Sequence, residues 1–349
     1  MARAPGAARE TIMKAVGYIK SLPITEERAL FDFEAEAPAP GPRDLLVRVK
    51  AVSVNPVDTK VRMRRAGSEG APVILGWDAA GVVEAVGAEV TLFKAGDEVF
   101  YAGDLNRPGT NAELHLVDER LVGHKPTSLG FAEAAALPLT SLTAWEGLFD
   151  RLQVPLGGGD GASLLVIGAA GGVGSLAVQL ARQLSRVTVI GTASRAESRA
   201  WVEGLGAHAV IDHSRPLSEE LDAAGLGLVD YTYTLTHTDT HWAEIIKAAK
   251  PQGRIAIIDD PATLDALPLK GKSLSLHWEL MFTRSLFQTP DMIRQHEILN
   301  EVARLVDAGT LRTTLGEHFG SINAANLTRA HARLESARSI GKIVLEGWD

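Results

Sequence analysis

Residues Leu164–Arg182 read LLVIGAAGGVGSLAVQLAR, and this stretch decides how the rest of the chain is interpreted. Its first four residues are all apolar, which is typical of a short strand buried on both faces of a parallel sheet. Glycines are frequent in residues 168–174, and apolar residues recur at helical spacing from Gly172 onward. The stretch therefore predicts a strand, a tight turn and a helix whose free N–H groups and positive dipole end face the turn.

The turn carries the spacing Ala169-x-Gly171-x-x-Gly174, a GxGxxG motif with alanine in first place. The middle glycine allows a pyrophosphate to approach the backbone, and the last one allows the helix to pack closely on the strand. Because the motif lies between a strand and a helix, it predicts a dinucleotide-binding turn. A turn that binds nothing and an uncharged membrane span are the alternatives, and the glycines argue against the span. The candidate cofactor-binding residues of the turn are Ala170, Gly171, Gly172 and Val173.

The residue that would contact the adenosine ribose follows the turn by about 20 positions, where an acid favours NAD and an arginine accommodates the extra phosphate of NADP. Here the second strand, residues 187–190, leads into Ser194 and Arg195, and Arg199 follows one helical turn later. Because no acid stands at the strand end, we expect NADP(H), bound by these three residues. The alternative is a solvated helix face with Ser194 as its N-cap, although capping and phosphate binding can coexist.

Composition limits the possible functions. The 349 residues are 46% hydrophobic, enough for two domains, and the net charge of −8 speaks against nucleic acid or an anionic membrane as a partner. There is no cysteine, which excludes disulfides and cysteine-ligated metals and suits a cytoplasmic protein. Residues 1–12 lack the apolar segment of a signal peptide, so we expect a disordered leader or a misplaced start.

The pattern of predicted elements changes at Pro138. Residues 13–138 consist mostly of short strands with turns, which indicates a β-rich, barrel-like domain. Strands and helices then alternate, which predicts the α/β class with a doubly wound parallel sheet. The segment Ser273–Leu280, SLSLHWEL, alternates strictly and is expected to be the edge strand. An unprotected apolar edge invites pairing with a second copy, so we expect a homodimer through this strand.

Six stretches carry a resemblance to a known family: SVNPVDTKVR, LGWDAAGVVEAVG, KAGDEVF, AALPLTSLTAWEGL, GAAGGVG and GKIVL, in this order. From Met13 onward the chain resembles the medium-chain dehydrogenase/reductase superfamily and, within it, the zinc-free quinone oxidoreductase group. The resemblance implies a GroES-like catalytic domain made of residues 13–138 and 312–349. It also implies a Rossmann NADP(H)-binding domain at residues 139–311, with the active site in the cleft.

The resemblance also bears on zinc, which related alcohol dehydrogenases hold with two cysteines and a histidine. It places Asn55, Trp77 and Leu139 or a neighbour at these three positions, and the four-cysteine lobe for a structural zinc is absent. We therefore expect no metal. Histidines 237 and 241 are the remaining candidates, but two ligands without a third make a poor site, and capping of the next helix by Thr238, Asp239 or Thr240 is the preferred interpretation.

Without a metal, the charge that develops on a hydride acceptor must be stabilised in another way. A quinone or conjugated enal spreads this charge over its π-system, whereas a simple ketone ordinarily needs a Lewis acid. The missing zinc ligands therefore favour conjugated acceptors. The resemblance places Asn55 and Thr143 beside the nicotinamide as catalytic and cofactor-binding candidates, although Asn55 is also a predicted N-cap of a helix from Pro56 and Thr143 an ordinary helical threonine. Further cofactor contacts implied by the family layout are Leu235, Ile258, Asp259 and Lys342.

Lys60 replaces a tyrosine found in well-known bacterial members of the group. We hypothesise that Lys60 polarises the acceptor oxygen or pairs with an anionic substrate group, the alternative being a surface lysine. Trp77 is expected to wall the cleft or to pack in the core. Pocket shape is expected to depend on Met281, Phe282 and Phe287.

The sequence thus favours a cytoplasmic, metal-free, NADPH-dependent oxidoreductase acting on a small electrophilic acceptor, a quinone or another conjugated carbonyl compound. One alternative is an NADPH-dependent alkene reductase for an enal or unsaturated acid, which Lys60 would favour if it binds a carboxylate. The other is a protein that binds NADPH in a structural or regulatory role with little catalysis.

Overall fold

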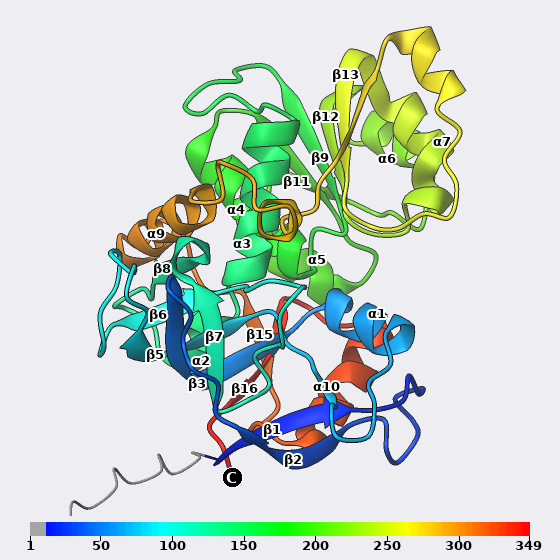
Figure 1. Cartoon of the computed structure of the whole chain (residues 1–349). Coiled ribbons are helices and arrows are strands. Elements are labelled where there is room, and N and C mark those ends of the chain that lie inside the picture. The colour runs from blue at the N-terminus through cyan, green and yellow to red at the C-terminus, as the bar shows by residue number, and fades with distance from the viewer. Residues whose placement is uncertain (1–11) are drawn as a thin grey trace, which may run out of the picture.

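The computed structural model describes residues 12–349, which form two lobes (Figure 1). The upper lobe in this view is built on a six-stranded parallel sheet with the order β11-β10-β9-β12-β13-β14 within the described residues. This order, in which the first strand β9 lies at the centre and the chain winds outward in both directions, confirms the predicted doubly wound sheet. Its strands are β9 (Ser163–Ile167), β10 (Thr188–Thr192), β11 (Ala209–Ile211), β12 (Val229–Thr234), β13 (Ala249–Ile257) and β14 (Ser275–Trp278).

Helices cover both faces of this sheet, because alternate residues of β9 point to opposite sides. Leu164 and Val166 belong to the core that includes α4, whereas Leu165 and Ile167 belong to a second core with α6 and α7. The central strand is therefore buried on both faces, as its unbroken apolar run predicts. The helices of this lobe are α4 (Gly172–Leu184), α5 (Ala196–Gly204), α6 (Leu217–Ala223), α7 (Thr238–Ala248), α8 (Thr283–Leu286) and α9 (Arg294–Asp307), with 3₁₀ turn η3 (Leu267–Lys272).

The lower lobe is β-rich, and it contains both the first and the last described strands of the chain, β1 and β16 (Figure 1). Its main sheet has the order β15-β16-β3-β5-β6-β8, with β7 on β3, among the described residues. The strands are β3 (Asp44–Val54), β5 (Ala79–Val86), β6 (Glu98–Tyr101), β7 (Leu114–Asp118), β8 (Val122–His124), β15 (Leu315–His318) and β16 (Lys342–Glu346). A smaller sheet holds β1 (Ile12–Tyr18), β2 (Phe31–Glu36) and β4 (Val73–Ile74). Strand β16 inserts between β15 and β3, so the C-terminal segment completes a sheet begun near the N-terminus.

Short helices complete this lobe and connect it to the other. They are α1 (Pro56–Arg64), η1 (Glu119–Leu121), α2 (Phe131–Ala135), α3 (Pro138–Trp145), the π-helix η2 (Glu146–Arg151) and α10 (Ala324–Glu335). Helix α3 is buried at every position, and it continues into η2 without a break.

Two predictions at the edges of the fold need adjustment. The edge strand β14 begins at Ser275, because Ser273 adopts a left-handed conformation that ends η3, and Leu280 lies beyond it. Pairing of β14 with a second copy stays a prediction. The predicted disordered leader lies outside the described residues except for Ile12, which begins β1 opposite Glu36. Within residues 12–349 we find no helix with the length and apolar character that a membrane crossing requires.

Candidate active site

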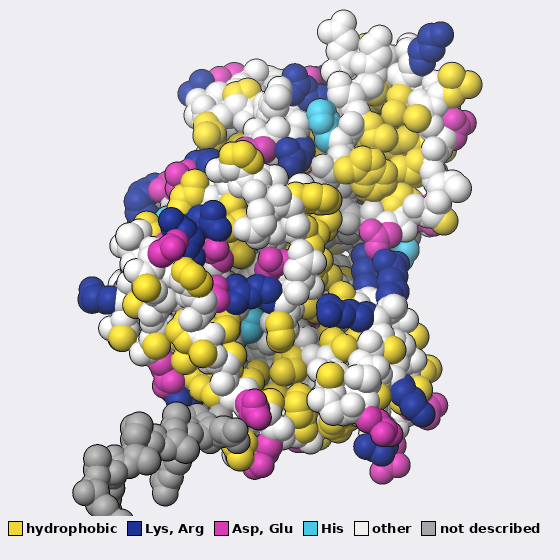
Figure 2. Space-filling model, in the orientation of Figure 1, with side chains coloured by type: hydrophobic (Ala, Val, Ile, Leu, Met, Phe, Trp, Pro, Cys, Tyr) yellow, Lys and Arg dark blue, Asp and Glu magenta, His cyan; other side chains and the backbone are white. Residues whose placement is uncertain are grey.

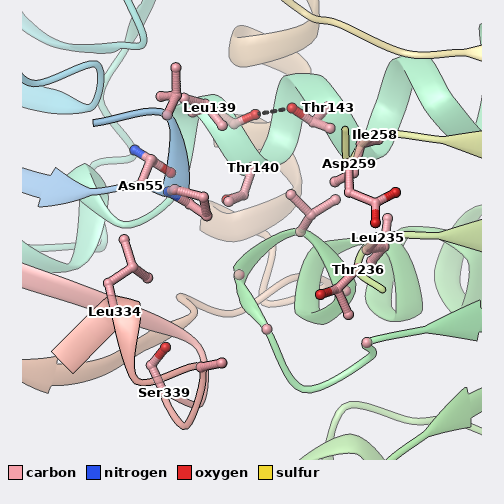
Figure 3. Close-up of a pocket in the computed structure, with 18 of the residues that line it drawn as sticks. Asn55, Leu139, Thr140, Thr143, Leu235, Thr236, Ile258, Asp259, Leu334 and Ser339 are labelled. Atoms are coloured by element: carbon pink, nitrogen blue, oxygen red, sulfur yellow. Dashed lines mark hydrogen bonds between the residues drawn. The ribbon is translucent and has the colours of Figure 1, made fainter. Parts of the chain in front are cut away.

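A cavity of about 740 Å³ is lined by residues of both lobes. One end lies at the glycine turn and the carboxyl ends of the parallel strands, which is where doubly wound sheets bind their ligands. The other end lies between α1 and α3 and includes Asn55 and Thr143 (Figure 3). The sequence-predicted residues that line this cavity are Asn55, Lys60, Thr143, Ala170, Gly171, Gly172, Val173, Ser194, Arg195, Leu235, Ile258, Asp259 and Lys342.

The glycine turn has the geometry that its motif predicts. A Cβ on Gly174 would lie 2.4 Å from the carbonyl oxygen of Gly168, so only glycine permits this approach of helix to strand. At Gly171 the nearest atom would be 3.5 Å away, and this residue faces the cavity. Gly171 is the N-cap of α4 and, among the described residues, no side chain caps this helix. The open N-terminus of α4 therefore fits the pyrophosphate of a dinucleotide.

The end of β10 lines the cavity through Ser194 and Arg195. Arg195 itself is the N-cap of α5, which corrects the alternative of a Ser194 cap, and its Nη2 donates to the carbonyl oxygen of Arg338 at 3.0 Å. Arg199 is also corrected: its Nη1 donates to the carbonyl oxygen of Val210 at 2.5 Å, which turns it toward β11 and away from the described lining. Because Arg199 lies one helical turn after the N-cap, its guanidinium points toward the neighbouring strand β11.

His213 is a lining residue that the sequence analysis missed. It follows β11, and its Nδ1 lies 3.0 Å from the hydroxyl of Thr192 at the end of β10. Burial lowers the pKa of the His213 imidazole, so the neutral ring is favoured beside the end of β10. No local pattern marks a histidine after a short strand, so only the folded topology reveals it.

Asn55 is buried, with 1% of its surface exposed, and it is the N-cap of α1, as predicted. Helix α1 is closed by the reverse contact, in which the Asn55 N–H donates to Asp58 Oδ2 at 2.6 Å. The Asn55 amide instead donates through Nδ2 to Asp78 Oδ2 at 2.8 Å and accepts a hydrogen bond from Lys342. The Asn55 side chain itself forms no capping hydrogen bond, because a buried carboxylate and an ammonium compete for the amide.

Lys342 is the centre of this network. Its Nζ lies 2.9 Å from Asp78 Oδ2 and 3.0 Å from the carbonyl oxygen of Val54, in addition to its bond with Asn55. The same Asp78 accepts the Leu139 N–H at 2.8 Å. Burial raises the pKa of the Asp78 carboxyl, and the Lys342 ammonium opposes that shift. An ammonium of this chain thus contacts Asn55, one of the three residues that the resemblance aligns with zinc ligands.

Trp77, at another of those aligned positions, is not part of the described cavity lining. Its indole Nε1 donates to the carbonyl oxygen of Asp104 at 3.2 Å, and its ring is buried in the core of the β-rich lobe. Packing explains Trp77, and the expectation that it walls the cleft is wrong. Within residues 12–349, no group of three or more histidine, cysteine, aspartate or glutamate side chains is arranged to hold a metal ion.

Helix α7 begins differently from the prediction. His237 is its N-cap, in a left-handed conformation with φ of 51°, and Asp259 supplies the capping contact by accepting the Thr238 N–H at 2.9 Å. The carboxylate of Asp259 therefore caps α7 from the end of β13, and none of residues 238–240 is the N-cap. His237 itself lines the cavity.

Thr143 lies at the α3 side of the cavity, and its hydroxyl donates to the carbonyl oxygen of Leu139 at 2.9 Å (Figure 3). The backbone carbonyl of Thr143 accepts the hydroxyl of Tyr233 at 2.7 Å. The opposite wall consists of residues 279–282, where Met281 and Phe282 are buried and line the cavity as predicted. Phe287 is 76% exposed and lies outside the described lining, which corrects its predicted role.

Lys60 lies at the rim of the cavity and is paired within the protein. Its Nζ is 3.1 Å from Asp260 Oδ2, and Arg64 Nη2 lies 3.7 Å from the same oxygen. Helix α1 provides both basic residues, and the segment after β13 provides the acid. Basic side chains over α1 meet acidic ones at the edge of the upper lobe in Figure 2. Any substrate anion at Lys60 would compete with Asp260.

Comparison with known proteins identifies this architecture. Two family models match the chain: an alcohol dehydrogenase GroES-like domain over residues 41–146 and a zinc-binding dehydrogenase domain over residues 205–345. A zinc-type alcohol dehydrogenase-like protein of Staphylococcus aureus is 40% identical over 338 residues, which cover 95% of this chain and 99% of that protein. A quinone oxidoreductase of Pseudomonas aeruginosa is 34% identical over 315 residues, covering 88% and 92%.

A crystal structure from Rhizobium etli, of a proposed zinc-dependent alcohol dehydrogenase protein, is 57% identical, with a TM-score of 0.94 and coverage of 97% of this chain and 99% of that one. Together with the fold and the glycine turn, these matches define the class: an oxidoreductase of the medium-chain dehydrogenase/reductase superfamily, whose members bind a nicotinamide cofactor. Within that class, the chain belongs to the zinc-type alcohol dehydrogenase-like proteins, in the group that includes quinone oxidoreductases. It does so without a single cysteine.

Proposed function

We propose that this protein is an NADPH-dependent oxidoreductase that reduces quinones or other conjugated carbonyl compounds without a metal ion. The observation that carries the proposal is a cavity that joins an uncapped dinucleotide turn to Asn55, which stands at a position aligned with a zinc ligand and is bound by Lys342 and Asp78. The nicotinamide cofactor, when bound, supplies the hydride. The side chains around the cofactor have to bind it, orient it toward the acceptor and exclude water from the cavity.

The preference for NADPH rests on the end of β10. Ser194 and Arg195 offer a hydroxyl and a guanidinium to the cavity, and the sequence from Thr192 to Arg195 contains no acid that would repel a phosphate. An arginine recognises a phosphate by paired, charge-assisted hydrogen bonds. The Arg195 guanidinium now contacts a carbonyl oxygen of Arg338, which still leaves several of its N–H groups available.

The acceptor preference rests on charge. All three N–H donors of Lys342 are directed to Val54, Asn55 and Asp78, so this ammonium contributes a nearby positive field rather than a proton. Such a site suits an acceptor that delocalises its own charge, as quinones and enals do. The aromatic ring of Phe282 and the apolar side chains of Met281 and Ile258 offer a surface for a flat, conjugated molecule.

A second candidate, reduction of an unsaturated acid, is favoured by the basic rim. Lys60, Arg64 and Arg65 all line the cavity, and Asp260 is the carboxylate that ion-pairs with the first two in the described structure. A substrate carboxylate could replace Asp260 there, since exposed ion pairs are weak. This candidate shares the cofactor and the cavity with the first and differs in the acceptor.

The test is the loss of nicotinamide absorbance with NADPH and NADH in parallel, against a simple quinone, a conjugated enal and an unsaturated acid, each with a chelator present. Turnover with NADPH that is insensitive to the chelator supports the proposal, and the preferred acceptor separates its two forms. Binding of NADPH without turnover of any acceptor would favour a protein that only binds the cofactor. Turnover that disappears with the chelator would overturn the metal-free proposal.

A further inference from the structure

A second cavity, of about 450 Å³, lies beside the acceptor end of the first. Arg65, at the end of α1, lines both cavities. The consecutive residues Leu105 and Asn106 line one cavity each, Leu105 the first and Asn106 the second. The reaction proposed above uses only the first cavity. Because the second has a volume typical of small-molecule sites, it offers room for a further part of a ligand.

The walls of the second cavity are two loops, residues 65–74 and 106–108. Backbone hydrogen bonds hold both loops in place. The N–H of Gly67 donates to the carbonyl oxygen of Ile19 at 2.8 Å, and β4, at the end of the first loop, pairs with β1. The residue after the second loop donates its N–H to the carbonyl oxygen of Ile74 at 2.9 Å. The cavity is therefore formed by the folded lower lobe itself, before any ligand binds.

The second cavity has a basic lining. Its described lining residues include Arg65 and Arg107 and no acid. Arg107 is balanced, because its Nη1 and Nη2 donate to the two carboxylate oxygens of Asp44 at 2.8 and 2.9 Å. The guanidinium of Arg65 differs, since within residues 12–349 it forms neither an ion pair nor a hydrogen bond. Arg65 is thus a cation without a partner in the described structure, at the point that the two cavities share.

The backbone of Arg65 is held from two sides. Its N–H donates to the carbonyl oxygen of Val61 at 2.9 Å, where it closes the end of α1. Its carbonyl oxygen accepts the hydroxyl of Tyr18, a fully buried residue, at 2.6 Å. Only the side chain of Arg65 therefore has to be ordered when it binds a ligand, which limits the entropy that binding costs.

The other basic residues of α1 already have an acid between them. Lys60 Nζ and Arg64 Nη2 lie 3.1 and 3.7 Å from the same oxygen of Asp260, so a ligand anion there has to compete with a carboxylate. An anion that reaches Arg65 meets no such competitor in the described structure. A guanidinium binds a carboxylate or a phosphate through paired, charge-assisted hydrogen bonds.

We propose that the second cavity is a subsite for the tail of the acceptor. The conjugated head lies in the first cavity, and a tail that ends in a carboxylate or a phosphate extends to Arg65, whose guanidinium binds the anion. The apolar side chains of Pro72, Val73 and Pro108 offer contacts to the methylene groups of the tail. This inference rests on the proposed function, because it names a substrate class for the same site: conjugated carbonyl compounds with an anionic tail.

The test measures kcat and KM with NADPH for a series built on the preferred acceptor of the assay above. Each member carries an alkyl tail of a different length that ends in a carboxylate, a phosphate or an uncharged carboxamide. At the tail length that reaches Arg65, kcat/KM for the anionic compounds is expected to exceed that of the carboxamide roughly fivefold. The gain is expected in KM, because the tail does not touch the reacting atoms. It is expected to shrink at high salt, because Arg65 is exposed.

Arg65→Met removes the charge and keeps an unbranched side chain, so it is expected to abolish the preference for anionic tails at every length. Arg64→Met is the matched control, because it removes the neighbouring charge, which lines only the first cavity. This control is expected to keep the preference. An equal loss in both variants would assign the effect to the general positive charge of α1 and would overturn the proposal.

Two further variants test the cavity without changing its charge. Ala66→Trp and Ser68→Trp each add a large side chain at an exposed residue that lines the second cavity and not the first. Each is expected to lower kcat/KM for the long anionic acceptor relative to that for the acceptor without a tail. A ratio that stays unchanged in both variants would overturn the proposal, because the tail would then lie elsewhere.

Equilibrium binding separates failure of this inference from failure of the proposed function. Binding of the same compounds is followed by quenching of tryptophan fluorescence, which needs no turnover. If none of them is reduced, the proposed function fails, but Arg65→Met is still expected to weaken binding of the carboxylate compound and not of the carboxamide. If the compounds are reduced with no preference for an anion at any tail length, the proposed function stands and this inference is wrong.

Discussion

The two ends of the cavity are built in different ways. The dinucleotide end is made of consecutive residues: a strand, glycines 171 and 174 and the uncapped start of α4. Their backbone geometry forms the site that fits a pyrophosphate. The acceptor end is made of side chains from segments far apart in sequence, such as Asn55, Asp78 and Lys342, which meet through buried charges. The dinucleotide end depends on the absence of side chains at its glycines. The acceptor end depends on side chains that each bind a particular partner.

This difference predicts two kinds of sensitivity to mutation. Adding atoms at the dinucleotide end creates clashes with backbone that cannot move, whereas removing a charge at the acceptor end leaves its partner buried and unpaired. Four substitutions, taken from the largest expected effect to the smallest, test whether the two ends respond in these two ways.

Gly174→Ala is expected to have the largest effect, because its Cβ would lie 2.4 Å from the carbonyl oxygen of Gly168. We expect a loss of stability of about 3 kcal/mol or more, with cofactor binding abolished. The matched control is Gly171→Ala, whose Cβ would meet its nearest atom at 3.5 Å. This control is expected to fold normally in thermal unfolding and yet bind NADPH weakly. Equal destabilisation by both changes would contradict the contrast between them.

Lys342→Met tests the buried network at the acceptor end. Because Asp78 would lose the ammonium that lies 2.9 Å from its Oδ2, we expect unfolding in urea to show a loss of about 3–5 kcal/mol. Adding Asp78→Asn to Lys342→Met is expected to recover part of that loss, since the unpaired charge is then gone. A double variant less stable than the single one would show that the network is held by packing and not by charge.

Arg195→Ala tests the dinucleotide end. Arg195 is the residue of this end whose side chain we expect to contribute to NADPH binding. Loss of a charge-assisted hydrogen bond costs about 1.5–3 kcal/mol, so NADPH affinity is expected to fall roughly 10- to 100-fold. NADH affinity is expected to stay the same. Arg199→Ala is the control, because Arg199 contacts the carbonyl oxygen of Val210 outside the described lining. An equal loss in both variants would argue against a phosphate site at Arg195.

Lys60→Met is expected to have the smallest effect on quinone turnover. The Lys60–Asp260 pair is partly exposed, and such pairs contribute at most about 1 kcal/mol, equal to a change of at most about fivefold. An unsaturated acid is the informative substrate, since its KM is expected to rise if its carboxylate binds at Lys60. Unchanged kinetics on every accepted substrate would show that Lys60 neither polarises the acceptor nor binds a substrate anion.

The dinucleotide end was predictable because its information is local. The run from Leu164 to Gly174 contains both the strand and its turn, and the missing acid before Arg195 is visible in the sequence itself. Arg199 failed for a local reason as well: helical spacing carried its side chain toward β11. A pattern of residue types shows proximity along the helix but not which neighbouring strand the side chain will meet.

The acceptor end was only partly predictable because its information is distributed. Asn55 was expected to cap α1, and nothing next to it in sequence signals that Lys342, nearly three hundred residues later, will bind its amide.

The insertion of β16 between β15 and β3 also constrains when the molecule can become functional during its synthesis. The sheet of the β-rich lobe gains the strand between β15 and β3, and the cavity gains Lys342, only from residues 342–346. Residues 342–346 therefore have to leave the ribosome before this lobe can close, whereas the strands of the parallel sheet end at Trp278. Pairings of such long sequence separation are slow to form, so this lobe is expected to mature last. Until then, the nascent chain exposes an unfinished sheet edge at β3, where chaperones would be most needed.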